Sequence, residues 1–438
     1  MSSVFYRTPS RSYPTISHGH GVWLWDTSGK QYLDGSSGAL VANIGHGRQD
    51  IAEVLADQSR RIAFAHTMRF TSEPQEALAA LLRKKLGTGD YRTYFVSGGS
   101  EATETAIKMA RQYHLEQGQP ERRKIVGRWA SYHGNTLGAL AVSGHIARRR
   151  PYDPLLPPGF GHIDVPREDN PVCEQALTNG QLCPCLNAVD AVFQQEGPHT
   201  IAAVFMEVVG GSALSGFVPH RGYLPGLQRL CRDYGILLVV DEVMTGCGRT
   251  GQWFAFHHEQ LSPDLVTMAK GLAAGYAPLG AVAARNHIWE AFRRGSGAFA
   301  HGFTYGGNPL SAAVGHRVLE IIEQAQLVER AKHQGSALHS LLNRLQQRFE
   351  FIQTVRGRGL MQGLVLAPTS ELPPGGRAAL LGQIAFEQGL IIYPGSGGQD
   401  SPVGDHILIA PPFIIDDEEL EVLEKRLIVS LERLSSMT

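Results

Sequence analysis

Residues 236–242 (ILLVVDE), five apolar residues followed by two acids, decide the fold of this chain. In an extended conformation these apolar side chains point to both faces, so both faces must be covered by other parts of the chain. Such a strand is typical of the interior of a parallel sheet. The acids directly after it would lie at the edge where open α/β sheets bind their ligands.

Similar short apolar segments recur along the chain and alternate with helical patterns. The sequence predicts helices over 101–117 and 224–234, and strands over 94–96, 124–126, 202–206, 236–240, 265–268 and 279–283. This alternation predicts an α/β fold built on a large, mainly parallel sheet.

The character of the sequence changes near residues 60 and 325. Apolar segments on either side of a turn at Ser28-Gly29 predict a hairpin in an N-terminal arm. A long amphipathic helix is predicted over 325–349, and a final helix from Asp416. We therefore expect three parts: an arm over residues 1–60, a large domain over 61–325 and a smaller α+β domain over 326–438.

Charge and hydropathy limit the possible partners. The 438 residues include 40 Lys+Arg and 41 Asp+Glu, a net charge of −1, so no general cationic field attracts nucleic acid. No run of about 18 apolar residues is present to span a bilayer. The first 17 residues lack the apolar core of an export signal. These features predict a cytoplasmic protein that binds neither nucleic acid nor membrane.

The cysteines raise the question of a metal. Five are present, and an odd number in a large chain without an export signal indicates reduced thiols. Cys173, Cys183 and Cys185 cluster in one segment and are candidate zinc ligands. Since no fourth ligand stands at a recognisable spacing, the sequence favours ordinary thiols and no metal site.

Residues 97–101 (SGGSE) lie between a predicted strand and a predicted helix. Glycines let the backbone approach an anion, and the N-terminus of the helix offers unpaired N–H groups, with the Ser100 hydroxyl as a further donor. The segment fits a phosphate cradle. It fits equally well an ordinary tight turn in which Ser100 caps the helix.

Two charged residues follow predicted strands. Asp241 is costly to bury at such a place unless a cation, such as a protonated ring nitrogen, pairs with it; the alternative is a loop cap. Lys270 follows the strand over 265–268 and precedes Gly271. Burial would make its amine a nucleophile able to form a Schiff base, and the alternative is a surface lysine whose stem alone packs.

A phosphate cradle, an acid for a ring nitrogen and a lysine for an aldehyde are together what pyridoxal phosphate requires. The sequence also resembles the class III (ω-amino acid type) pyridoxal-phosphate aminotransferases over nearly its whole length. The resemblance is carried, in order, by residues 97–111 (SGGSEATETAIKMAR), 131–134 (SYHG), 241–251 (DEVMTGCGRTG), 269–271 (AKG) and 304–309 (TYGGNP).

The resemblance implies fold type I, with a large α/β/α domain and a smaller α+β domain formed by the C-terminal part and the N-terminal arm. It implies that Lys270 holds pyridoxal 5′-phosphate and shuttles a proton, and that Asp241 keeps the ring nitrogen protonated. The other cofactor-binding residues implied are Gly99 and Ser100 at the phosphate, Tyr132 and Val243 on the two ring faces, His133, Glu207 near the substrate, and Thr304 from the partner subunit. A site shared in this way implies a homodimer, and it leaves open whether dimers pair into tetramers.

The implied activity is transfer of an amino group from an amine or ω-amino acid to pyruvate or 2-oxoglutarate, by a ping-pong mechanism through pyridoxamine phosphate. An isomerase of the same fold (an aminomutase, racemase or epimerase) is the alternative enzyme class, since it shares the lysine. A non-enzymatic binding role is a third class, which would call for a lost lysine or an added domain.

Two departures from the family concern the substrate. Many relatives bind a carboxylate with an arginine of the C-terminal domain, where a guanidinium suits a carboxylate. Here residues 395–404 occupy the comparable loop, and no arginine occurs between Arg377 and Arg426. Leu40 stands where amine-using relatives often carry a tryptophan, so we expect a wider pocket there and a bulky or ω-placed amine as donor.

Overall fold

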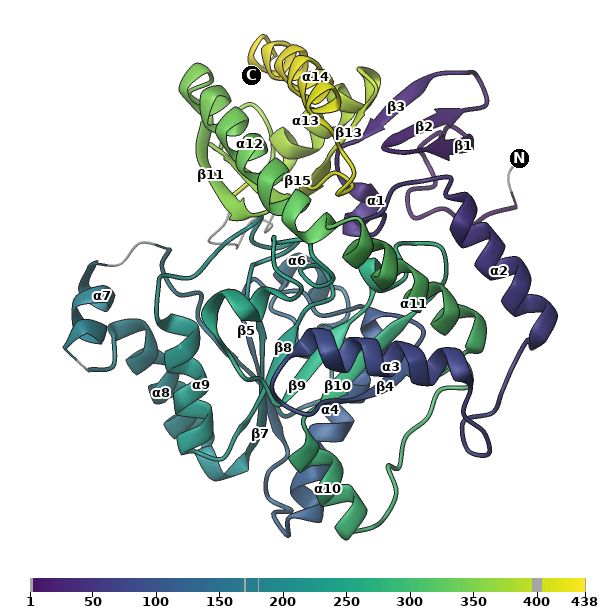
Figure 1. The fold of residues 1–438 in the computed structure, drawn as a ribbon. Helices are drawn as coiled ribbons and strands as arrows, with labels where there is room; N and C mark the ends of the chain where they lie inside the picture. The colour runs from purple at the N-terminus through teal and green to yellow at the C-terminus, as the bar shows by residue number, and fades with distance from the viewer. Residues whose placement is uncertain (1–2, 169–170, 180, 396–403, 438) are drawn as a thin grey trace.

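The computed structural model describes residues 3–168, 171–179, 181–395 and 404–437. Figure 1 shows a large sheet in the lower part of the molecule and both ends of the chain in the upper part.

A seven-stranded sheet, in the order β4-β10-β9-β8-β7-β5-β6, forms the centre of the lower part. β10 runs antiparallel to both of its neighbours, and every other neighbouring pair is parallel. The strands are Arg92–Val96 (β4), Lys124–Arg128 (β5), Phe160–Ile163 (β6), Ile201–Glu207 (β7), Leu237–Asp241 (β8), Leu265–Met268 (β9) and Gly280–Ala284 (β10). The expected α/β fold with a mainly parallel sheet is confirmed.

Helices cover both faces of this sheet, as the sequence of β8 predicts. Leu237 and Val239 pack in one hydrophobic cluster, and Leu238 and Val240 in another, because successive side chains of a strand point to opposite faces. The first cluster includes residues of α4 (Gly99–Glu116) and α10 (Asn286–Arg294). The second includes residues of α3 (Glu73–Leu86), α8 (Pro184–Glu196), α9 (Tyr223–Asp233) and α11 (Pro309–Gln324).

The upper part combines both ends of the chain (Figure 1). One sheet has the order β1-β2-β3-β13 and a second has the order β11-β12-β15-β14. Their strands are Ile16–His20 (β1), Trp23–Asp26 (β2), Gln31–Asp34 (β3), Ile352–Arg358 (β11), Met361–Leu366 (β12), Leu390–Ile391 (β13), Tyr393–Gly395 (β14) and His406–Ile409 (β15). The helices packed on them are Leu327–Arg348 (α12), Gly376–Glu387 (α13) and Asp417–Ser435 (α14).

Shorter elements connect these parts. They are Ser37–Leu40 (α1), Gln49–Arg61 (α2), Leu137–Val142 (α5), Ile146–Arg149 (α6), Pro171–Thr178 (α7), and 3₁₀ turns at Asp153–Leu155, Pro198–Thr200, Ala255–Glu259 and Lys270–Leu272. Within the ranges that the structure describes, no helix combines the length and the apolar character needed to cross a membrane.

The six predicted strands of the large sheet agree with the structure to within two residues at each end. The hairpin of the arm is present as β2 and β3, and the long helix over 325–349 corresponds to α12. β6 and β11 are strands that the sequence did not predict. The part boundaries near residues 60 and 325 stay a prediction.

Candidate functional site

Three parallel strands end, and one helix begins, at a single cavity of about 190 Å³. Glu207 closes β7 and Asp241 closes β8, where the two residues are paired in register. Lys270 follows β9 by two residues, and α4 begins after β4. Eight of the ten predicted site residues line this cavity, namely Gly99, Ser100, Tyr132, His133, Glu207, Asp241, Val243 and Lys270.

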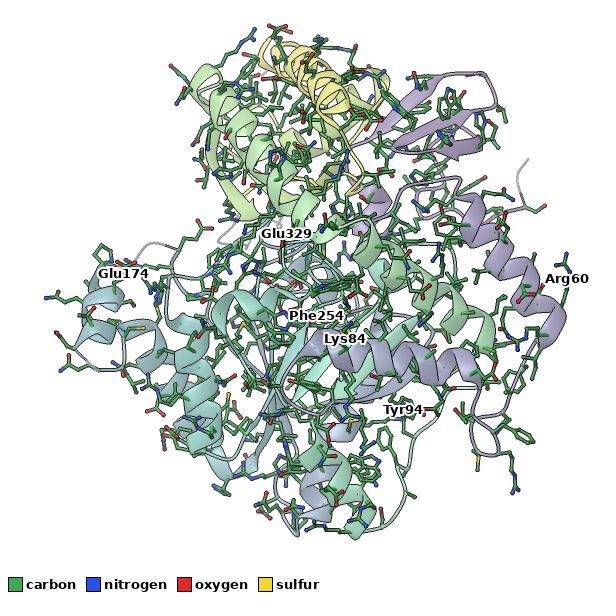
Figure 2. The ribbon with its side chains drawn as sticks, in the orientation of Figure 1. Arg60, Lys84, Tyr94, Glu174, Phe254 and Glu329 are labelled. Carbon is green, nitrogen blue, oxygen red and sulfur yellow. The ribbon has the colours of Figure 1, made fainter. Side chains whose placement is uncertain are left out.

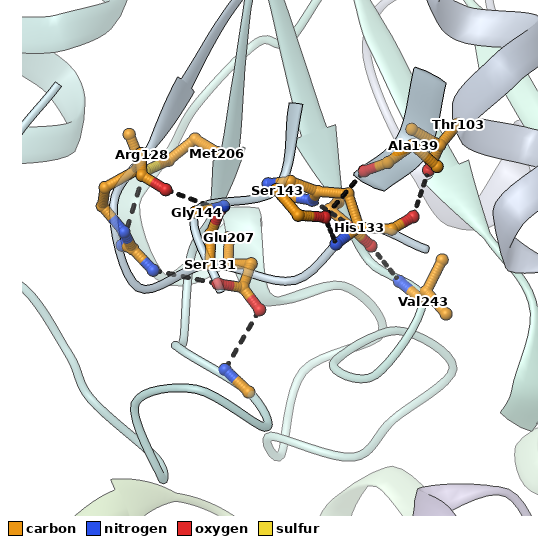
Figure 3. Close-up of polar contacts among 12 residues, drawn as sticks. Thr103, Arg128, Ser131, His133, Ala139, Ser143, Gly144, Met206, Glu207 and Val243 are labelled. Atoms are coloured by element: carbon orange, nitrogen blue, oxygen red, sulfur yellow. Dashed lines mark hydrogen bonds and ion pairs between the residues drawn. The ribbon is translucent and has the colours of Figure 1, made fainter. Parts of the chain in front are cut away.

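The carboxylate of Asp241 is buried, and its two oxygens have different partners. Oδ2 lies 2.6 Å from Nδ1 of His133, and Oδ1 accepts the N–H of Val243 at 2.9 Å. Figure 3 shows that His133 is held in turn, because its N–H donates to Ser143 Oγ (2.8 Å) and its carbonyl accepts from Thr103 Oγ1 (2.7 Å). The acid is therefore fixed on the cavity wall by groups that are themselves fixed.

The start of α4 has the features of an anion-binding turn. Gly98 is the N-cap residue and has no side chain to satisfy the N–H groups of the first turn. Ser100 lies inside that turn and its Oγ accepts the N–H of Asn135 at 2.9 Å, so the alternative in which Ser100 caps the helix is wrong. A Cβ atom on Gly134 would lie 2.7 Å from Ser100 Oγ, so glycine keeps this corner of the cavity open.

The Lys270 side chain reaches the cavity from the 3₁₀ turn after β9. Its φ of +48° is in the left-handed region, which is uncommon for a residue with a side chain and is frequent at functional sites. Burial lowers the pKa of Lys270 from 10.5 to about 8, although the charges of Asp241 and Glu207 oppose this. A larger fraction of this amine than of an exposed lysine is therefore uncharged near neutral pH, and the uncharged amine is the form that acts as a nucleophile or base.

Arg128 is the residue of this region that the sequence did not single out. It closes β5, is fully buried, and its NH2 atom lies 3.0 Å from Oε2 of Glu207 (Figure 3). Oε1 of Glu207 accepts the N–H of Gly211 at 3.2 Å. Burial raises the pKa of Glu207, and the Arg128 charge opposes that shift. The only signal in the sequence was an arginine at the end of a largely apolar strand.

Two predicted site residues do not line this cavity. Thr304 is exposed on the segment between α10 and α11, and Leu40 is buried with 1% of its surface exposed. The roles predicted for both stay predictions. In the substrate loop predicted over 395–404, residues 396–403 lie outside the described residues.

Comparison with known proteins identifies the family. The model of the family described as "Aminotransferase class-III" matches residues 6–430. The chain belongs to the class III aminotransferases. This aminotransferase is 38% identical over 431 residues to the uncharacterized aminotransferase YodT of Bacillus subtilis, a match that covers 97% of this chain and 96% of the relative.

Solved structures of transaminases have the same fold. An (S)-enantioselective ω-transaminase from Thermomicrobium roseum matches with a TM-score of 0.88 and 35% identity, covering 98% of this chain and 96% of the other. An amine transaminase from an uncultivated Pseudomonas species, in its pyridoxal-phosphate-bound form, matches with a TM-score of 0.90 and 31% identity, covering 99% of each chain. Fold type I and the family are thus confirmed, and so is the expected cofactor, because class III aminotransferases depend on pyridoxal phosphate.

Proposed function

We propose that this aminotransferase moves an amino group from an amine or ω-amino acid to pyruvate or 2-oxoglutarate in two half-reactions at the cavity. The proposal is carried by one observation: the Lys270 amine, the His133–Asp241 pair and the start of α4 line the same cavity. When bound, pyridoxal phosphate supplies an aldehyde that amines attack and a ring that withdraws electrons.

The residues present fit this cofactor. The N–H groups of the first turn of α4 and the Ser100 hydroxyl would hold its phosphate, at the positive end of the helix dipole. Asp241 would pair with the ring nitrogen, which explains a buried carboxylate whose only basic neighbour in direct contact, among the described residues, is an imidazole. Tyr132 and Val243 line the cavity and would contact the two ring faces.

Lys270 would bind the aldehyde and then act on protons. Once a substrate amine has taken its place, the Lys270 amine is available to remove and return a proton at the substrate carbon that bears nitrogen. Its lowered pKa raises the fraction of this amine that can accept a proton near neutral pH above that of an exposed lysine. The Arg128–Glu207 ion pair adds little net charge to the cavity, since the two opposite charges lie 3.0 Å apart.

A keto-acid acceptor needs a cationic partner, and we assign Arg148 to this role. Its guanidinium lies 4.3 Å from the ring centroid of Tyr132, and its charge contributes to the lowered pKa of Lys270. No carboxylate within the described ranges forms an ion pair with Arg148, whereas Arg128 is paired with Glu207. Arg148 is thus a charged donor beside the cavity that is available to a substrate carboxylate.

The donor class is tested with a panel of ω-amino acids, primary amines and α-amino acids, each assayed with pyruvate and with 2-oxoglutarate. We expect turnover with ω-amino acids or amines, and activity confined to small α-amino acids would contradict the proposed donor. With the donor alone, about one carbonyl product should form per active site, as two half-reactions require. Continuous conversion of a substrate without any keto acid would instead identify an isomerase.

The role of Arg148 is tested by Arg148→Gln, with the neighbouring Arg150→Gln as the control. A hydrogen bond to a charged group contributes about 1.5–3 kcal/mol, so the KM for the keto acid should rise roughly tenfold or more. The KM for an amine donor without a carboxylate should stay the same. An unchanged KM for the keto acid would exclude Arg148 as the carboxylate-binding residue.

A further inference from the structure

Three cysteines and one histidine meet outside the cofactor cavity, in the part of the chain that leads into α9. Cys173 is on α7, Cys183 is the N-cap residue of α8, and Cys185 is in the first turn of α8. His220 precedes α9 and lies 37 positions after Cys183. The α7 segment is at the left in Figure 2, where its Glu174 is labelled.

Cys173, Cys185 and His220 have the mutual distances of ligands around one metal ion, and Cys183 contacts the histidine of this group. The sulfurs of Cys173 and Cys185 are 3.6 Å apart, and the Cys183 sulfur is 3.8 Å from Nε2 of His220. The ligand atoms of Cys173, Cys185 and His220 all lie within 4.8 Å of one another. Tetrahedral zinc, with bonds of about 2.3 Å to sulfur and 2.0–2.1 Å to nitrogen, places two sulfurs about 3.8 Å apart and sulfur and nitrogen about 3.6 Å apart.

The histidine ring is oriented for this purpose. Nδ1 of His220 lies 3.1 Å from the carbonyl oxygen of Arg221, so a proton on Nδ1 is satisfied by the backbone. The lone pair of Nε2 then faces the cysteines. A ring N–H that donates to a backbone carbonyl while the other nitrogen binds metal is the usual arrangement of a histidine ligand.

The cysteines and the histidine of this cluster lie largely in the interior of the protein. Cys173 and Cys183 are fully buried, His220 is 5% exposed and Cys185 is partly buried, so most of the cluster is shielded from water. Each of the three sulfurs is a soft ligand of the type that zinc prefers.

We propose that Cys173, Cys183, Cys185 and His220 bind one Zn²⁺ ion in a tetrahedral Cys₃His site. Binding forms three Zn–S bonds and one Zn–N bond and releases the three thiol protons to solvent, with no change of oxidation state. Four protein ligands leave no position for water or substrate, so the site is structural.

The ion would fasten two segments that are distant in sequence. It would join α7 and the start of α8 to the loop between β7 and α9. That loop directly follows Glu207, the last residue of β7, which lines the cavity. Only one backbone hydrogen bond, from His220 N–H to the Arg167 carbonyl at 3.3 Å, is described between His220 and the chain that precedes α7. The sequence did not reveal the fourth ligand because His220 follows both α8 and β7.

The test begins with the native holoenzyme. After growth with zinc and removal of loosely bound metal by gel filtration, elemental analysis should find about one zinc per chain. Exchange for Co²⁺ should produce strong sulfur-to-cobalt absorption bands and the visible bands of a tetrahedral site. A chelator strong enough to remove zinc should lower the melting temperature while the metal-free protein still binds pyridoxal phosphate.

Variants assign the ligands. Cys185→Ser and His220→Gln should each lose most of the zinc and change the cobalt spectrum, whereas Cys231→Ala, which alters a buried cysteine of α9, should keep both. The spectrum of the unaltered protein decides the matter even if a variant does not fold. Native protein that holds no zinc and gives no sulfur-to-cobalt bands would overturn the proposal. So would a Cys173–Cys185 disulfide found by peptide mapping of native protein kept from added oxidants and reductants.

Discussion

Nδ1 of His133 lies 2.6 Å from Oδ2 of Asp241, although the two residues are 108 positions apart in the sequence. The contact closes a chain of hydrogen bonds that starts at Thr103 and Ser143 and ends at the carboxylate. Since Val243 N–H occupies the other oxygen of Asp241, rotation of the acid would break a hydrogen bond on either side. A carboxylate held this firmly can serve as a fixed partner for a ring nitrogen.

Asp241→Asn should leave the cofactor bound and reduce kcat by roughly 100-fold or more. The amide keeps the size of the side chain but cannot hold a proton on the ring nitrogen, and an uncharged ring withdraws electrons poorly. Cofactor content by absorbance and kcat by a coupled assay are the two measurements. Undiminished turnover in the variant would mean that another acid serves the ring.

Lys270→Ala should remove the absorbance of the bound cofactor at about 410 nm, because that band requires the covalent bond to the lysine. Turnover should be lost as well, and added small amines should restore part of it. Asp241→Asn serves as the comparison, because it should keep the covalent bond. A band that persists in Lys270→Ala would show that another amine holds the cofactor.

Lys270→Met should stabilise the cofactor-free protein in a pH-dependent way. Because the pKa of Lys270 is about 8 in the folded chain and 10.5 when unperturbed, the unfolded state binds more protons between these values. The free-energy cost of burying the charged Lys270 amine is therefore full below pH 8 and disappears as the pH rises to about 10.5. The gain in melting temperature over the unaltered protein should be largest at pH 7 and small at pH 10.5, and a gain independent of pH would contradict this reasoning.

Glu207→Gln should destabilise the protein by about 3–5 kcal/mol, because it leaves the buried Arg128 guanidinium without its counter-ion. The double variant Glu207→Leu with Arg128→Met should recover much of this loss, since no buried charge remains. Urea unfolding measures both. Glu424→Gln, which breaks the more exposed ion pair with Arg344, is the control and should cost less than about 1 kcal/mol. Equal effects at the two sites would argue against a special role for burial.

The sequence revealed those features whose free-energy cost depends on neighbouring residues in the sequence and not on distant contacts. Charge at the end of an apolar strand is expensive wherever the strand goes, so Asp241 and Lys270 stood out before any partner was known. β8 and β9 could also be predicted from local sequence, because they are apolar on both faces. β6, with the sequence Phe-Gly-His-Ile, and β11, which is rich in polar residues, lack such a run.

The features that were missed depend on contacts across the fold. Arg128 could not be assigned a role from the sequence, because it meets Glu207 only when β5 and β7 lie side by side. His220 reaches the cysteines only after α8 and β7 have folded between them. The resemblance to a family supplied Tyr132, Val243 and Thr304, whose residue types alone indicate no chemistry.

The pairing of β3 with β13 has a consequence for synthesis. Leu33 and Asp34 lie beside Leu390 and Ile391 in register, and Trp23 donates from Nε1 to Glu419 across 396 positions. All seven strands of the large sheet, by contrast, lie between residues 92 and 284, so that sheet can form while the ribosome is still translating. The first strands to leave the ribosome must wait for nearly the last ones. A chain terminated before residue 390 therefore loses the edge strand of its N-terminal sheet as well as its own C-terminus.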